Sequence, residues 1–214
     1  MSLFLLVLEI LGTVSFAVSG ALTGLKKDMD IFGISILGLT TAVGGGIIRD
    51  LLLGITPPMT FRNPVYALAA ILTSIIVFLP PIRRELLSNN HLSSKLLQVT
   101  DSLGLAVFTV NGVQVAFNMG QNYDLFLLVF LGTVTGVGGG VMRDVMAGDK
   151  PFIFVKQVYA CAAIVGALLC ALLWKPFGST CAMLTGLIAI FIIRSLSAHY
   201  HWSLPKAHIE EQNK

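Results

Sequence analysis

Charged residues are scarce in this sequence: Asp, Glu, Lys and Arg make up only 12% of the 214 residues, whereas 55% are hydrophobic. Soluble domains carry about 25% charged residues, so this composition excludes an ordinary soluble domain. A bilayer core of about 30 Å needs roughly 20 apolar residues per helix, which leaves room for about six to eight spans and no second soluble domain. We therefore expect an all-α integral membrane protein.

Signatures of enzymes and of nucleic-acid binding are also missing. The sequence has no Gly-x-Ser-x-Gly, His-Glu-x-x-His or Walker lysine, so we expect neither an enzyme nor a site for nucleotide-driven transport. The net charge of +3 is spread over connections without a basic and aromatic array, which argues against a nucleic-acid partner. The sequence has no Cys-x-x-Cys pair among Cys161, Cys170 and Cys181. We therefore expect these cysteines to behave as small hydrophobic side chains, and we expect no bound metal or cofactor.

Seven apolar runs predict seven transmembrane helices, at about 3–25, 31–53, 65–82, 103–119, 125–147, 152–174 and 178–198. Together they form a single membrane domain, residues 1–198, followed by a polar tail, residues 199–214. If the spans alternate, one side carries Lys26, Lys27, Arg83, Arg84, Lys95, Lys150, Lys206 and Lys214, and the other carries Arg62 and Lys175. The positive-inside rule then places the N-terminus outside and the tail in the cytoplasm.

An internal repeat organises the chain, since the stretch Val43–Asp50 (VGGGIIRD) recurs as Val137–Asp144 (VGGGVMRD). A shift of 94 residues also superposes Thr41 on Thr135, and a shift of 92 superposes 16–21 on 108–113. Each repeat, about 3–82 and about 99–174, contains three predicted spans. Because three is odd, the second repeat must enter the membrane from the opposite side, which predicts an inverted repeat plus a seventh helix at about 178–198.

The glycine triplets predict breaks in the second and fifth helices, because glycine has the weakest helix propensity short of proline. A break frees backbone groups, which are tolerated at membrane depth only inside protein or beside a watery cavity. The alternative is close helix packing, in which glycines let two backbones touch. The candidate pore and helix-break residues are Gly44, Gly45, Gly46, Gly138, Gly139, Gly140, Thr41 and Thr135.

Two Arg-Asp pairs, Arg49–Asp50 and Arg143–Asp144, follow the triplets at a depth where charges are costly. Adjacent residues on a helix do not face one another, so we expect each arginine to pair with an aspartate or carbonyl of another span. The pairs either line or gate a polar path, or they fix the fold as internal ion pairs.

Neutral polar side chains recur on one face of the first and fourth predicted spans. They are Ser15, Ser19 and Thr23 at i, i+4, i+8, and Asn111, Gln114 and Asn118 at i, i+3, i+7. Such groups can replace part of an ion's hydration shell or bind a small polar solute, and the alternative is hydrogen bonding between helices. The role of Glu9 stays open.

The duplicated Gly-Gly-Gly-x-x-Arg-Asp, at 44–50 and 138–144, resembles the prokaryotic branch of the trimeric intracellular cation (TRIC) channels, over about 190 residues. Bacterial members are also labelled glycine transporters. The resemblance implies a lipid-embedded homotrimer in the bacterial inner membrane, each protomer passing monovalent cations, chiefly potassium, through a path bent at the triplets. Arg49 and Arg143 are then gate candidates. The alternative is a facilitator or secondary transporter for a small zwitterion such as glycine.

Overall fold

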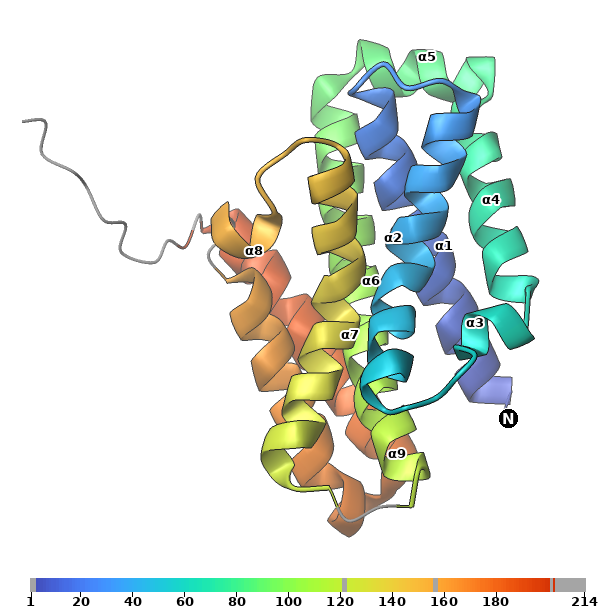
Figure 1. Cartoon of the computed structure of the whole chain (residues 1–214). Coiled ribbons are helices and arrows are strands. Elements are labelled where there is room, and N and C mark those ends of the chain that lie inside the picture. The colour runs from blue at the N-terminus through green and yellow to red at the C-terminus, as the bar shows by residue number, and fades with distance from the viewer. Residues whose placement is uncertain (1–2, 121–122, 156–157, 201, 203–214) are drawn as a thin grey trace, which may run out of the picture.

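The computed structural model describes residues 3–120, 123–155, 158–200 and 202, and its regular structure is entirely helical (Figure 1). Along the chain the helices are α1 (Leu3–Leu25), α2 (Ile31–Leu52), α3 (Met59–Arg62), α4 (Val65–Phe78), α5 (Pro80–Ser88), α6 (Asn90–Asn118), α7 (Leu125–Met146), α8 (Phe152–Val155) and α9 (Tyr159–His199). The predicted tail lies outside the described residues except for 199, 200 and 202.

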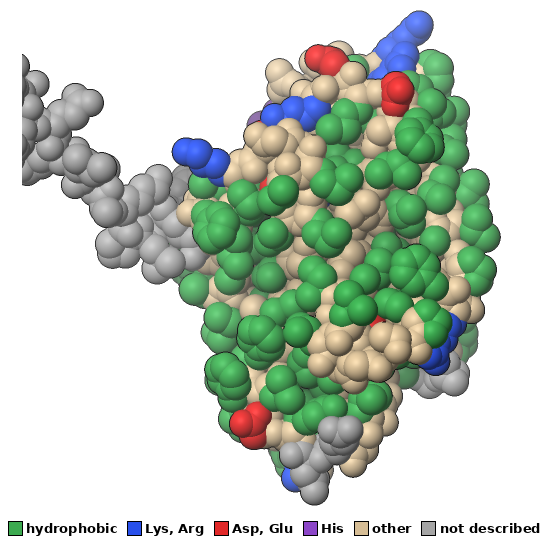
Figure 2. Space-filling model, in the orientation of Figure 1, with side chains coloured by type: hydrophobic (Ala, Val, Ile, Leu, Met, Phe, Trp, Pro, Cys, Tyr) green, Lys and Arg blue, Asp and Glu red, His purple; other side chains and the backbone are tan. Residues whose placement is uncertain are grey.

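Within the described part of the chain, five helices are long and apolar enough to cross a membrane, or six if α4 and α5, bent by 68°, count as one span. Figure 2 shows hydrophobic side chains over the middle of the molecule and charged ones mainly toward its two ends. Exposed phenylalanines such as Phe32 and Phe126 belong to this apolar surface. An all-helical membrane protein was predicted from composition, and the structure agrees.

Gly178 interrupts α9, where its φ of 80° and ψ of 164° leave the helical region. The parts of α9 before and after Gly178 lie side by side, because Gly166 contacts Ile190 and the backbone of Gly186. A side chain at Gly166 would meet the Ile190 side chain at 2.2 Å. The chain therefore reverses close to the predicted connection at 175–177.

The repeat-related helices α2 and α7 begin and end with the same local chemistry. The Asp30 carboxylate accepts a hydrogen bond from the Gly33 amide at 2.7 Å, and Asp124 accepts one from the Leu127 amide at 2.9 Å. These N-caps satisfy amides that have no partner within the helix. Both helices are followed by a glycine with positive φ, Gly54 and Gly148 in turn, which ends the helix.

The predicted connection at 83–102 is helical, which corrects the sequence-based boundaries. Two prolines, Pro80 and Pro81, end α4 at Phe78 and start α5. After it, α6 begins at Asn90, whose preceding residue Asn89 accepts a hydrogen bond from the Leu92 amide at 2.9 Å. Apolar runs locate the membrane-embedded part of a helix and miss a polar extension such as the first turns of α6.

The predicted helix breaks at the glycine triplets are wrong, because α2 and α7 run through Gly44–Gly46 and Gly138–Gly140 without interruption. Instead the triplets bring the two helices together. A side chain at Gly45 would lie 2.1 Å from the Thr135 carbonyl oxygen, and one at Gly139 would lie 2.1 Å from the Thr41 carbonyl oxygen. Intrahelical hydrogen bonds are retained where no water can replace them, so close packing is the correct alternative.

Candidate functional site

A cavity of about 710 Å³ lies between α1, α2, α3, α4 and α6, near the N-terminal end of α1 and the C-terminal ends of α2 and α6. Its polar lining residues are Glu9, Thr13, Arg49, Thr60, Arg62, Asn63, Tyr66, Asn111, Gln114 and Asn118. Pockets that bind small molecules have volumes of about 300–1,000 Å³ and few convergent polar groups, so this cavity can hold a small solute or a hydrated ion.

The predicted polar face of α6 contributes directly to this cavity, since Asn111, Gln114 and Asn118 all line it. The predicted polar face of α1 does not: none of Ser15, Ser19 and Thr23 lines the cavity. Ser19 and Thr23 are buried between helices, and the Thr23 hydroxyl donates to the Ser19 carbonyl at 3.0 Å. The hydrogen bond from Thr23 stays within α1, whereas the Ser19 hydroxyl accepts one from Arg143 of α7, as the alternative of hydrogen bonding between helices anticipates.

The remaining pore candidates lie mostly away from the cavity. Gly46 lines it, whereas Gly44, Gly45 and the second triplet pack against neighbouring helices. The hydroxyls of Thr41 and Thr135 each donate to the carbonyl four residues earlier, at 2.6 Å. Both threonines are fully buried, and neither lines the cavity.

Arg49 forms one wall of the cavity. Its Nε and Nη2 donate to Asp50 Oδ1 at 2.9 and 2.7 Å, and its Nη1 donates to Asn111 Oδ1 at 2.6 Å. The other Asp50 oxygen accepts from the Met59 amide at 2.7 Å. Arg49 thus bonds the side-chain carbonyl of Asn111 on another helix, and in addition the side chain turns back to the neighbouring carboxylate, which the sequence analysis did not expect.

Arg143 has the same local arrangement but is fully buried. Its Nε donates to Asp144 Oδ1 at 2.8 Å, and Asp144 Oδ2 accepts from the Phe152 amide at 2.8 Å. Arg143 Nη1 also donates to Asp101 Oδ1 of α6 at 2.7 Å and to the Ser19 hydroxyl. Here the predicted partner from another helix is present alongside the neighbouring aspartate.

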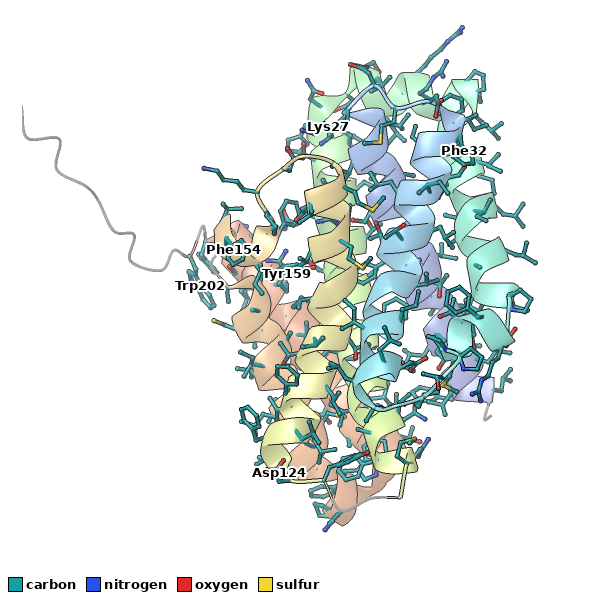
Figure 3. All side chains as sticks on the ribbon, in the orientation of Figure 1. Lys27, Phe32, Asp124, Phe154, Tyr159 and Trp202 are labelled. Carbon is teal, nitrogen blue, oxygen red and sulfur yellow. The ribbon has the colours of Figure 1, made fainter. Side chains whose placement is uncertain are left out.

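Further groups complete this buried cluster. Arg194, in the second half of α9, places Nη2 3.7 Å from Asp101 Oδ2. Tyr159 lies between α9 and α7 (Figure 3), with its hydroxyl 3.4 Å from Asp101 Oδ1 and its ring under Arg194. Two arginines and two aspartates balance in charge, which a dry interior requires. The cluster lies against the start of α8, where the centroid of the Phe152 ring is 4.6 Å from the Arg143 guanidinium carbon.

Glu9 lies in the wall of the cavity, away from the buried cluster of Arg143 and Asp101. The sequence analysis left its role open. Its Oε1 accepts from Asn111 Nδ2 at 2.8 Å, and its Oε2 accepts from the Tyr66 hydroxyl. Asn111 therefore lies between Glu9 and Arg49, binding both.

Four side chains of these polar clusters were given no role in the sequence analysis, although the repeat contains a signal for them. The shift of 92 that superposes α1 on α6 also puts Glu9 on Asp101, and a shift of 93 puts Tyr66 on Tyr159. Extending the repeat outward would have found these residues. Arg194 has no such signal because it lies beyond the second repeat. Among the described residues no group of His, Cys, Asp and Glu is placed to hold a metal ion.

Comparison with known proteins gives consistent matches over nearly the whole chain. The family model described as glycine transporter matches residues 6–80 and 98–175. The UPF0126 inner membrane protein YadS of Escherichia coli K12 is 37% identical over 210 residues, which cover 97% of this chain and 98% of YadS.

Solved structures match equally well. A crystal structure of a prokaryotic TRIC channel has a TM-score of 0.86 at 30% identity and covers 95% of this chain and 100% of its own. The TRIC trimeric intracellular cation channel orthologue from Rhodobacter sphaeroides has a TM-score of 0.82 at 30% identity, with coverage of 94% and 100%. The resemblance noted from the duplicated motif is confirmed.

Proposed function

This chain belongs to the glycine transporter family, and because it shares the fold of prokaryotic TRIC channels we propose that it is a monovalent cation channel, chiefly for potassium. The observation that carries the proposal is the cavity, whose wall combines the Glu9 carboxylate with the amides of Asn111, Gln114 and Asn118. Carboxylate and amide oxygens attract a cation and replace part of its hydration shell.

In this proposal each protomer of a homotrimer contains its own pore, and seven crossings form an inverted repeat with an added seventh helix. Reciprocal contacts support the repeat: Gly45 meets the Thr135 carbonyl as Gly139 meets that of Thr41. The two halves of α9 on either side of Gly178 supply the sixth and seventh crossings. The trimeric assembly is supported by the similarity to the Rhodobacter sphaeroides channel.

The proposed path enters the cavity at the N-terminal end of α1, passes the amides of α6 and reaches Arg49. In this proposal the layer of Arg143, Asp101 and Tyr159 lies beyond Arg49 and blocks the way to the end near α8, and the hydrogen bonds within that layer support a closed state. Conduction requires this layer to separate. In this proposal Arg143 is the gate, and Arg49 lies at the inner end of the cavity.

We place the protein in the bacterial inner membrane with its N-terminus outside. The E. coli relative is named as an inner membrane protein. Lysine and arginine are concentrated in the connections at the α5 and α8 end, which the positive-inside rule assigns to the cytoplasm. The cavity then opens to the outside.

The test is a current measurement on purified protein in a planar bilayer under a tenfold KCl gradient. A potassium channel gives a reversal potential near the potassium equilibrium value, about 59 mV in magnitude for one charge. Bilayers treated with protein-free detergent solution serve as the control. A reversal potential of chloride sign, or no current above the control at any voltage, refutes the proposal.

A second candidate function is facilitated passage of a small zwitterion such as glycine. The observation that favours it is that Glu9 and Arg49 line the same cavity on either side of Asn111, so an ammonium group and a carboxylate would each meet an opposite charge. Saturable counterflow of labelled glycine in proteoliposomes, without potassium current, would support this function over the channel.

A further inference from the structure

Glu9 is an ionisable residue in an apolar helix, and its charge is not matched by an ion pair. Ionised carboxylates at membrane depth are costly unless they are paired or strongly hydrogen-bonded. Glu9 accepts hydrogen bonds from Asn111 and the Tyr66 hydroxyl, yet no salt bridge formed by the described residues includes it. The carboxylate is half-buried and lines the cavity.

The counterpart of Glu9 in the second repeat does have a cation beside it. Asp101 accepts a charge-assisted hydrogen bond from Arg143 Nη1 at 2.7 Å, with the Tyr159 hydroxyl at 3.4 Å. The same acid and tyrosine pair thus holds a guanidinium directly in one half of the molecule. The pairing of an acidic side chain with a tyrosine hydroxyl therefore binds a positively charged group in the second repeat, which is independent evidence that the equivalent pair Glu9 and Tyr66 suits a cation.

The first repeat differs because its arginine does not reach its acid. Arg49 donates to Asn111 at 2.6 Å, and Asn111 in turn donates to Glu9 at 2.8 Å. The amide therefore separates the guanidinium from the carboxylate. In the second repeat Arg143 bonds its acid directly, whereas in the first repeat the Asn111 amide takes that position and Glu9 lines the cavity.

We infer that Glu9 is the cation-binding residue of the cavity and that its ligand is a monovalent cation or the ammonium group of a small solute. The inference rests on the proposed function and names the site at which the cation is bound. Gln114, whose Oε1 has only a long 3.4 Å contact with Asn111 Nδ2, supplies a second oxygen toward the cavity. Glu9 is the one carboxylate among the residues that line the cavity, beside the two arginines Arg49 and Arg62, so we expect any preference for cations over anions to depend on Glu9.

Glu9→Gln tests the site, because the amide keeps an oxygen that can accept from Tyr66 or Asn111 and removes only the charge. In planar bilayers at about 10 mM KCl we expect the unitary potassium conductance to fall about tenfold, a difference of ~1.4 kcal/mol in cation binding. The potassium-to-chloride permeability ratio falls with it. Asp28→Asn is the matched control, since Asp28 is exposed outside the cavity and its positive φ of 53° suits asparagine.

A binding measurement separates this inference from the proposed function. In detergent, replacing N-methylglucamine chloride by KCl at constant ionic strength should raise the melting temperature of the wild type and the D28N variant, and leave that of E9Q unchanged. Wild-type conductance and wild-type potassium stabilisation in E9Q overturn the inference and leave the channel proposal standing. Absence of cation or glycine passage in the wild type refutes the proposed function instead.

A transport comparison and a second variant complete the test. Proteoliposomes loaded with potassium alone, or with glycine in N-methylglucamine buffer, identify whether the bound group is an inorganic cation or an ammonium group. If E9Q aggregates on purification, Glu9→Asp replaces it, because this variant keeps the charge and withdraws it from the cavity by one methylene. A half-saturating potassium concentration several-fold higher than wild type supports the site, and an unchanged value overturns it.

Discussion

The contact between the two glycine triplets makes a prediction that distinguishes adjacent glycines of one helix. In Gly45→Ala the added methyl would lie 2.1 Å from the Thr135 carbonyl oxygen, whereas ordinary contacts begin at 3.4 Å. Because the obstacle is backbone, α2 must move away from α7 by about 1 Å, and such overpacking costs about 1–3 kcal/mol. Alanine gains about 1 kcal/mol of helix propensity over glycine, which offsets only the low end of this overpacking cost.

Gly46→Ala is the matched control, one residue further along α2. There the added methyl meets its nearest neighbour, Arg49 Nη2, at 3.8 Å, so the helix propensity gain of about 1 kcal/mol is not opposed by a clash. The propensity gain is the same in both variants, so they should differ by the overpacking cost alone, about 1–3 kcal/mol. At about 2–4 °C per kcal/mol this corresponds to roughly 2–12 °C in melting temperature.

The assay is thermal unfolding of both variants in the same detergent, followed by circular dichroism and by loss of the monodisperse elution peak. G45A should melt below the wild type and G46A at or above it. Equal melting temperatures for the two variants would refute the reasoning, since they would mean that the triplet does not form the tight crossing between α2 and α7.

Two other predictions concern charged pairs. Asp101→Asn leaves Arg143 and Arg194 buried with one carboxylate fewer, so it should destabilise the protein by about 3 kcal/mol, and adding Arg194→Met should restore part of the loss; an unchanged melting temperature of D101N contradicts the cluster. Lys27, which is labelled in Figure 3, forms a 2.5 Å pair with Asp149 of another connection, but both side chains are more than a third exposed. A double-mutant cycle of K27A and D149A should give a coupling below about 1 kcal/mol that falls with added salt, and a larger, salt-independent coupling would show that solvent does not screen the pair.

The helices whose ends were predicted best are those with a charged or capping residue at the boundary. The first apolar run, 3–25, coincides with α1 because Lys26 and Lys27 follow directly, and the second begins as predicted because Asp30 caps it. The early start of α6 could not be read from apolarity, since the residues at 90–102 are largely polar and form helix beyond the apolar run.

The site was predictable in part for a related reason. Arginines at membrane depth are conspicuous, so Arg49 and Arg143 were found, and the amide face of α6 followed from its spacing. Glu9 was noticed as a single charge in an apolar run but was given no role, and Asp101, the partner of Arg143 on another helix, was overlooked because it was assigned to a connection. The glycine triplets were misread as breaks because helix propensity describes an isolated helix. In this fold glycine is required because the backbone of the neighbouring helix leaves no room for a side chain.

Arg194 gives the molecule a direction that its duplicated sequence lacks. Two matching halves facing opposite ways would be equal in energy, and neither membrane face would be preferred as the shut one. By adding a second positive charge to the Asp101 carboxylate alone, the last helix lifts this degeneracy. In the proposed channel, the end near α8 is thereby the one held shut at rest, and the cavity end is the entrance.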